Sequence, residues 1–213
     1  MKYALFTTAL LATGMATAAV PIDGWYTSIF GGYTSLAPNI NTHHWSGALL
    51  THSSYNGGYN AGGRIGYQSN PIRYELEYTY LNATANRFRV NSIGQNHIQG
   101  SSTANFIMAN LYYDFPEFLA AISPFAGIGI GYAFMQATLE GEGPLGLTHF
   151  EANGNAFAYQ GTVGLTYNFS ENYALNASYR YTATGNNDNF GTGYKAQMGN
   201  VGIVYHFDTG TYK

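Results

Sequence analysis

Residues 72–81 (IRYELEYTYL) alternate, from Ile72 to Tyr80, between large apolar or aromatic side chains and charged or polar ones. Successive side chains of a β-strand point to opposite faces, so this period of two predicts a strand and not an α-helix, whose period is about 3.6. One face carries isoleucine, leucine and tyrosine, and the other carries Arg73, Glu75, Glu77 and Thr79. Two folds suit such a strand. In a soluble sandwich the charges face water, and in a small transmembrane barrel they face a narrow lumen while the tyrosines meet lipid.

The composition favours the barrel. Only 9% of the 213 residues are charged, against roughly a quarter in an average soluble protein, whereas the chain has 20 tyrosines, 13 phenylalanines and 27 glycines. A water-exposed surface so poor in charge would be poorly soluble, but a surface facing lipid needs no charge. A net charge of -3 with only 8 lysine and arginine residues argues against nucleic acid as a partner. The chain has no cysteine and therefore no disulfide or thiolate site.

Residues 1–19 predict a secretory signal peptide. Lys2 supplies the positive start, residues 3–15 are mostly apolar, and residues 16–19 (ATAA) are small enough for signal peptidase. A retained membrane anchor is the less favoured alternative, because the apolar run is shorter than the ~20 residues of a spanning helix. We therefore expect cleavage after Ala18 or Ala19 and an exported barrel domain of residues 20–213.

The same alternation recurs along the chain and gives eight strands in four pairs. The predicted strands are residues 25–36, 59–68, 72–81, 103–113, 124–137, 157–169, 173–182 and a last strand that ends at Phe207. Strands of this length match the roughly 9 to 11 residues that a tilted strand needs to cross a bilayer. Trp25 and Tyr26 open the first strand, where we expect both rings at the membrane interface.

Long polar stretches alternate strictly with shorter turns between these strands. The predicted loops are residues 37–56, 82–101, 138–154 and 183–194. Outer-membrane barrels have long loops outside and short turns at the periplasmic end, whereas a soluble sandwich has no reason to sort its loops by end. The sequence therefore predicts an all-β fold, an eight-stranded antiparallel transmembrane up-and-down β-barrel with both chain ends in the periplasm.

The alternation also predicts a set of charged side chains inside the barrel. Three are positive and three negative: Arg64, Arg73, Glu75, Glu77, Asp114 and Arg180. Because an eight-stranded barrel is just wide enough for side chains to fill it, we expect a lumen ion-pair network, with further hydrogen bonds from Asn110, Asn176 and Asn200. Acid–base catalysis by Glu75 and Glu77 is the less favoured alternative, since buried charges are normally paired.

Glycines and histidines supply two further expectations. Gly127, Gly129 and Gly131 share one face of a strand, and we expect the long arginine and glutamate side chains to occupy the space that they leave. Their spacing does not match a dinucleotide-binding loop.

Adjacent histidines on a loop, as at residues 43–44 and 52, rarely hold a tetrahedral metal, and His206 is expected to point inward. We therefore predict no metal, no other cofactor and no catalytic residue.

Three segments carry a resemblance to a known family: residues 24–33 (GWYTSIFGGY), 123–132 (SPFAGIGIGY) and 200–207 (NVGIVYHF). They resemble the OmpA/OmpX/opacity-protein superfamily of small eight-stranded outer-membrane proteins. The resemblance implies a place in the Gram-negative cell outer membrane, in contact with its lipid and with lipopolysaccharide. It also implies that Tyr205 and Phe207 form the terminal signal for the barrel-assembly machinery, although residues 208–213 follow.

The superfamily includes anchors, adhesins and surface antigens, so three functions remain open. The first is a non-enzymatic platform that displays four extracellular loops for envelope integrity, adhesion or contact with host surface molecules. The second is a narrow pore or channel for small solutes, which needs a lumen that the charges do not block. The third is an outer-membrane lipid-modifying enzyme. That enzyme would need a serine and a histidine near the rim on the lipid-facing side, whereas His206 is expected inside.

Overall fold

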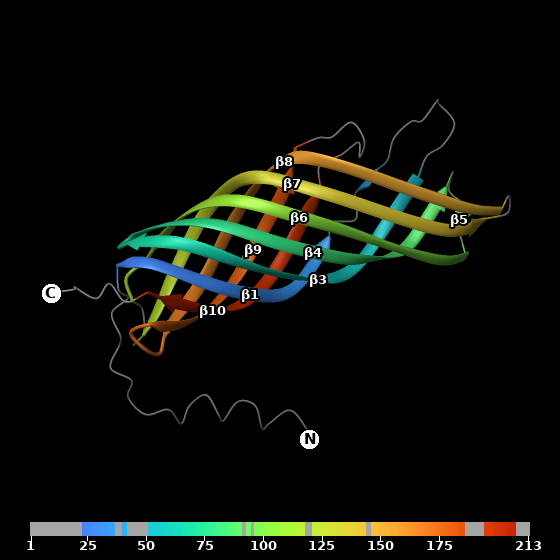
Figure 1. The fold of residues 1–213 in the computed structure, drawn as a ribbon. Coiled ribbons are helices and arrows are strands. Elements are labelled where there is room, and N and C mark those ends of the chain that lie inside the picture. Colours follow the sequence, from blue (N-terminus) through green and yellow to red (C-terminus); the bar gives the residue numbers. More distant parts are fainter. Residues whose placement is uncertain are drawn as a thin grey trace, which may run out of the picture.

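The computed structural model describes residues 23–36, 40–41, 51–90, 93–94, 96–117, 121–143, 146–185 and 194–207, so the predicted signal peptide lies outside it. Eight long strands in these segments form one closed antiparallel sheet (Figure 1). They are β1 (Gly24–Leu36), β3 (Thr51–Ser69), β4 (Ile72–Val90), β6 (Asn96–Asp114), β7 (Ile122–Gly143), β8 (Gly146–Asn168), β9 (Tyr173–Thr184) and β10 (Lys195–His206). The short strands β2 (Ile40–Asn41) and β5 (Ile93–Gly94) pair with β3 and β4.

The long strands run up and down, each beside its neighbours in the chain. The first and last strands then pair with each other, from Tyr26 opposite His206 to Leu36 opposite Ala196, and this pairing closes the cylinder. Closure gives each of the eight long strands two partners, so the barrel wall that they form has no free edge. The predicted eight-stranded antiparallel barrel is confirmed. No helix in the described segments is both long and apolar enough to cross a membrane.

The two faces of the sheet are inverted relative to a soluble protein. On β4, Tyr74 and Leu76 are each 56% exposed on the outside, whereas Glu75 between them is 5% exposed on the inside. Aromatic and aliphatic side chains cover the outside of the other strands in the same way. An apolar outer surface around a charged and polar interior is the pattern of a barrel in lipid. The faces predicted from the alternation are those observed.

Aromatic rings gather on the outside at the end where the short turns lie. Contacts between neighbouring rings, with centroids 5.0 to 6.4 Å apart, link Tyr167, Phe169, Tyr173, Tyr205 and Phe207 in sequence. Amphipathic rings prefer the membrane–water interface, so this row marks one edge of the apolar band.

The opening residues of β1 divide between the two faces. Trp25 points outward and packs edge-on against Tyr67, with the ring centroids 5.5 Å apart. Tyr26 is buried inside the barrel, so the expectation that both rings lie at the interface is wrong for Tyr26. Consecutive residues of a strand cannot share a face.

Several strands are longer than predicted. The antiparallel pairing of β7 with β8 continues to Gly143 opposite Gly146, so most of the predicted loop 138–154 is a strand hairpin (Figure 1). The start of β6 accompanies this hairpin, with Asn96 opposite Glu142. The predicted loops 37–56 and 82–101 likewise contain the ends of β3, β4 and β6. Backbone pairing needs no apolar face, so strands can continue where the sequence shows no clear alternation of apolar and polar residues.

Candidate functional site

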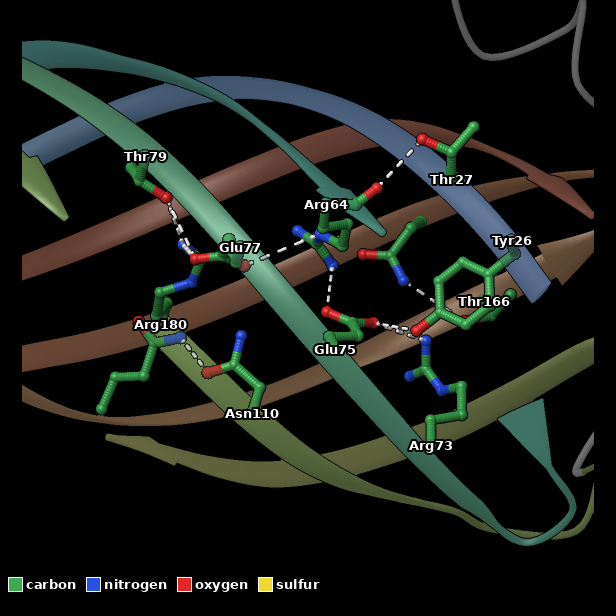
Figure 2. Close-up of polar contacts among 12 residues, drawn as sticks. Tyr26, Thr27, Arg64, Arg73, Glu75, Glu77, Thr79, Asn110, Thr166 and Arg180 are labelled. Atoms are coloured by element: carbon green, nitrogen blue, oxygen red, sulfur yellow. Dashed lines mark hydrogen bonds and ion pairs between the residues drawn. The ribbon is translucent and has the colours of Figure 1, made fainter. Parts of the chain in front are cut away.

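The inward face of β4 carries the centre of the lumen. Arg73, Glu75 and Glu77 follow one another there at every second position, and β3 places Arg64 directly opposite Glu77. Asp114 lies at the end of the neighbouring strand β6, and Arg180 reaches in from β9. The structure thus places all six charged side chains predicted from the alternation inside the barrel, where each is within reach of an opposite charge. Figure 2 shows the contacts among Arg64, Arg73, Glu75, Glu77 and Arg180.

Glu77 is held from three sides. Arg180 Nη1 lies 2.6 Å from Glu77 Oε1, and Arg64 Nε lies 3.7 Å from Glu77 Oε2. The hydroxyl of Thr79 donates a hydrogen bond of 3.0 Å to Oε1. The side chains of Glu77 and Arg180 are both 0% exposed, so this is a fully desolvated ion pair. Such a pair is stable only when each charge has an opposite charge close by, and here Glu77 lies between two arginines.

Glu75 has a similar set of partners. Arg73 Nη1 lies 3.2 Å from Glu75 Oε1, and Arg64 Nη1 lies 3.6 Å from Glu75 Oε2. The hydroxyl of Tyr26, on β1, donates a hydrogen bond of 2.5 Å to Oε1. Arg73 also pairs with Asp114, with 2.7 Å between Nε and Oδ2. The six charges therefore form one connected set whose formal charges sum to zero.

Aromatic rings complete this charged layer. The guanidinium carbons of Arg64 and Arg180 lie 4.4 and 4.9 Å from the ring centre of Phe30. That of Arg73 lies 4.8 Å from the ring centre of Phe125 and 5.1 Å from that of Tyr112. A guanidinium over an aromatic face keeps an attraction that does not need water. The alternation predicted polar residues on the inward face. It therefore did not predict these rings, although each occupies an inward position of its strand.

A layer of amides and hydroxyls follows toward the loop end. Asn60 Nδ2 donates to Thr34 Oγ1 at 2.8 Å, and Asn200 Nδ2 donates to Asn60 Oδ1. Gln160 Nε2 donates to Asn110 Oδ1 at 2.7 Å. Toward the turn end, Asn176 Nδ2 donates to Thr166 Oγ1 at 3.3 Å. The three asparagines expected to assist the charges thus form hydrogen bonds with other uncharged side chains.

An apolar layer comes next, closer still to the loop end. On β4 the inward positions pass from Glu77 through Thr79 to Leu81 and Ala83, and on β6 they pass from Asn110 to Met108 and Phe106. The cluster comprises Leu36, Leu81, Ala83, Ala104, Phe106, Met108, Ala133, Met135, Ala156, Ala158, Tyr194, Ala196 and Met198. All are buried. The alternation did not predict this layer, because an apolar residue that faces the lumen looks the same in the sequence as one that faces lipid.

The glycines of β7 make room for β6. In the register of the two strands, Gly127, Gly129 and Gly131 lie opposite Tyr112, Asn110 and Met108. A Cβ added at each glycine would collide with β6, in each case with atoms of the opposite residue or of its immediate neighbour. The expectation that arginine and glutamate side chains fill this space is wrong, because the directly opposite residues of the adjacent strand reach it first.

The remaining residues singled out in the sequence lie at the turn end of the barrel or have side chains that the structure does not describe. His206 points inward as expected, with its Nε2 3.2 Å from Gln68 Oε1. Phe207, 42% exposed, points outward beside Tyr205, and its backbone N–H donates to the carbonyl of Trp25 at 2.9 Å. Histidines 43, 44 and 52 lie where no side chain is described. Within the described segments, no group of three histidine, aspartate or glutamate side chains could hold a metal ion.

Comparisons with known proteins agree with this architecture. Residues 4–207 match the model of the outer membrane protein beta-barrel domain family. A protein of Gluconacetobacter diazotrophicus named "Outer membrane protein" is 26% identical over 196 residues, which are 85% of this chain and 51% of the relative. The chain thus spans about half the length of that curated relative.

Two solved structures share the fold. Neisserial surface protein A superposes with a TM-score of 0.57 at 16% identity, over 86% of this chain and 97% of that protein. OprG of Pseudomonas aeruginosa superposes with a TM-score of 0.53 at 13% identity, over 88% of this chain and 99% of that protein. At these identities the likeness shows the fold alone. With its closed barrel, its apolar outer face and a family match over nearly the whole sequence, the chain belongs to the outer membrane protein β-barrel family.

Proposed function

We propose that the protein is a non-enzymatic surface protein of the Gram-negative outer membrane, in which a sealed barrel serves as a rigid platform for the hairpins and loops at one end. The filled lumen carries this proposal. Along the barrel, the charged layer, the amide layer and the apolar layer follow one another, and their side chains are almost entirely buried. A barrel closed in this way has no transport task, and its variable parts are the segments beyond the strands.

The layers argue against the narrow pore. An ion on the axis would have to separate Arg180 from Glu77, whose side chains are both 0% exposed, and then lose its water in the apolar layer. Each step is costly, because charges in a low-dielectric interior need compensating partners. Rigid, interlocked side chains instead hold the walls of the barrel together.

The contacts of the two central carboxylates argue against catalysis. A general acid or base must reach a substrate and exchange its proton with it. Glu75 and Glu77 each face two arginines and a hydroxyl inside the closed layer. They therefore act as structural counter-ions, and the same holds for their arginine partners.

The outer surface and the two unequal ends suggest the partners. The exposed apolar belt meets outer-membrane lipid, and the extended β7–β8 hairpin would meet lipopolysaccharide and host surface molecules. The connections at the other end are short, with two residues between β3 and β4 and four between β8 and β9. Short turns belong to the periplasmic end of such barrels, where the assembly machinery would bind Tyr205 and Phe207 during insertion.

Labelling of intact cells tests the platform and its orientation. An epitope tag inserted at Asn187, between β9 and β10, should be stained on unbroken cells. The matched control is the same tag at Glu171, in the turn between β8 and β9, which should be stained only after the outer membrane is permeabilised. The reverse pattern would show that the short turns face outward and would overturn the proposed display of the loops.

A further inference from the structure

An open groove of about 610 Å³ lies on the lipid-facing side of β8, β9 and β10. Two small outward residues on neighbouring strands, Ala177 and Gly199, interrupt the bulky outer surface there, and a Cβ added at Gly199 would meet nothing within 4 Å. The side chains around them are apolar or aromatic and 49 to 63% exposed: Val163, Leu165, Tyr179 and Val201. A hydrocarbon chain in such a groove touches protein on more sides than it would on a convex wall, and so gains dispersion contacts over bulk lipid.

The outer face of β10 changes its chemistry from this groove toward the loop end. Gln197 is the next outward position after Gly199 and lies directly opposite Ser35 of β1. Lys195 is the outward position that follows. The side chains of Gln197, Ser35 and Lys195 are all exposed. The surface thus passes from an apolar groove to neutral hydrogen-bonding groups and then to a positive charge.

Among the described side chains, Lys195 is the only basic one on the outside of the barrel. Arg64, Arg73 and Arg180 pair with carboxylates in the lumen. Lys195 forms no ion pair with a described residue, and the residue opposite it on β9 is Ala183. A lysine at the edge of an apolar band lays its methylene stem along that band and keeps its ammonium in water. There it attracts the phosphate of an anionic lipid.

The distance between this charge and the groove suits one lipid molecule. Lys195 and Gly199 lie about 13 Å apart along the strand, at about 3.3 Å per residue. A phosphorylated lipid presents its phosphate, its polar linkage groups and its acyl chains in the same order. We infer that this face binds one molecule of lipopolysaccharide through its lipid A part. A phosphate contacts Lys195, the sugar and amide groups lie beside Gln197 and Ser35, and an acyl chain occupies the groove.

This inference rests on the proposed function, because lipopolysaccharide forms the outer leaflet and the loop end must face outward to meet it. It adds a defined lipid site to a platform that otherwise needs only bulk lipid. Lipid binding is measured on purified protein, whereas the tag at Asn187 is scored on intact cells. The lipid site and the display of the loops can therefore fail separately.

Native mass spectrometry of the folded barrel tests the site. The protein in an uncharged detergent is titrated with lipid A, with lipid A whose phosphates have been removed, and with phosphatidylglycerol. Lipid A should saturate at one molecule per barrel. Removal of its phosphates should raise the Kd about fivefold, the effect of one lysine near an anionic lipid, and phosphatidylglycerol should bind more weakly than lipid A. Equal binding of phosphatidylglycerol would show a general attraction to anionic lipid, and equal binding of the phosphate-free lipid would show that phosphate is not recognised. Either result overturns the inference.

Variants at the two ends of the site separate the charge from the groove. Lys195→Gln should raise the Kd for lipid A about fivefold and leave that for the phosphate-free lipid unchanged, whereas Lys195→Arg should bind as the wild type does. Gly199→Leu fills the groove and should weaken the binding of both lipids. The control is Gly63→Leu, at an outward glycine of β3 that has room for a Cβ and lies outside the groove. It should bind both lipids normally.

The shift in gel migration on heating shows whether each variant is folded. If folded Lys195→Gln or folded Gly199→Leu binds lipid A as the wild type does, the assigned site is wrong.

Discussion

Arg180 Nη1 and Glu77 Oε1 lie 2.6 Å apart, although 103 residues separate them in the chain. Their strands, β9 and β4, are four strands apart in either direction around the barrel and so face each other across the lumen. Most strand contacts join neighbours, but this pair joins opposite walls. It links these two walls within the charged layer.

Removal of one partner of this pair should destabilise the barrel strongly. Arg180→Ala leaves Glu77 buried with only the more distant Arg64, and loss of one member of a buried pair typically costs about 3 to 5 kcal/mol. The free energy of unfolding, measured by urea titration of the protein in lipid vesicles, should fall by this amount. Tyr179→Phe, on the lipid-facing side of the same strand, is the control and should change it by less than about 0.5 kcal/mol.

The double variant Arg180→Met, Glu77→Gln tests whether the loss comes from the unpaired charge. Both charges are then absent. The double variant should therefore lose less unfolding free energy than the single variants Arg180→Met and Glu77→Gln lose in sum. Strictly additive losses would show that the two side chains do not interact and that their closeness is incidental.

The two kinds of glycine in the sheet should respond in opposite ways to alanine. A Cβ at Gly131 would collide with the backbone carbonyl of Ile107, so Gly131→Ala should cost about 1 to 3 kcal/mol of unfolding free energy. A Cβ at Gly161 would meet nothing within 4 Å on the outer face. Gly161→Ala should therefore be neutral or gain up to about 1 kcal/mol, because alanine restricts the unfolded chain. Equal losses at both sites, again from urea titration, would contradict the proposed packing of β6 against β7.

Alternation, composition and the sorting of long and short loops together predicted the barrel, and alternation predicted the charged residues inside it. Residues that face lipid are mostly apolar and residues that face the lumen are mostly polar. The alternation in a strand such as 72–81 therefore indicates which residues point outward and which point inward. Arg64, Arg73 and Arg180 could be placed in the lumen for that reason. Their partners could not be assigned, because pairing across the lumen depends on the stagger between strands, which a single strand does not record.

Other features of the structure, among them the long hairpin and the apolar layer, could not be predicted from alternation. The β7–β8 hairpin continues where the sequence no longer alternates clearly between apolar and polar residues, so the sequence predicted a loop there. The apolar layer of Met108, Met198 and Phe106 lies inside the barrel, where an apolar residue looks the same in the sequence as one that faces lipid. Tyr26 shows the same limit, since an aromatic residue at a strand end suits both the interface and the lumen.

The end of β10 should matter for assembly more than for the stability of the finished barrel. Phe207 points outward and its ring contacts only the exposed Tyr205 among the ring pairs described, so Phe207→Ala removes little packing. If Tyr205 and Phe207 are read by the assembly machinery, the variant should reach the outer membrane in clearly reduced amount, as judged by its heat-shifted band on gels. Phe169→Ala, in the same aromatic row, is the control and should assemble normally. Equal yields of the two variants would show that Phe207 is not part of the signal.

Conductance in planar lipid bilayers tests the sealed lumen most directly. Folded wild-type protein should insert without a stable open level, because the buried Arg180–Glu77 pair and the buried apolar layer obstruct the lumen. A wide porin, inserted under the same conditions, shows that open channels would be detected. A large and stable conductance from the wild-type barrel would mean that its charges line an open channel, and the narrow pore would then replace the platform as its function.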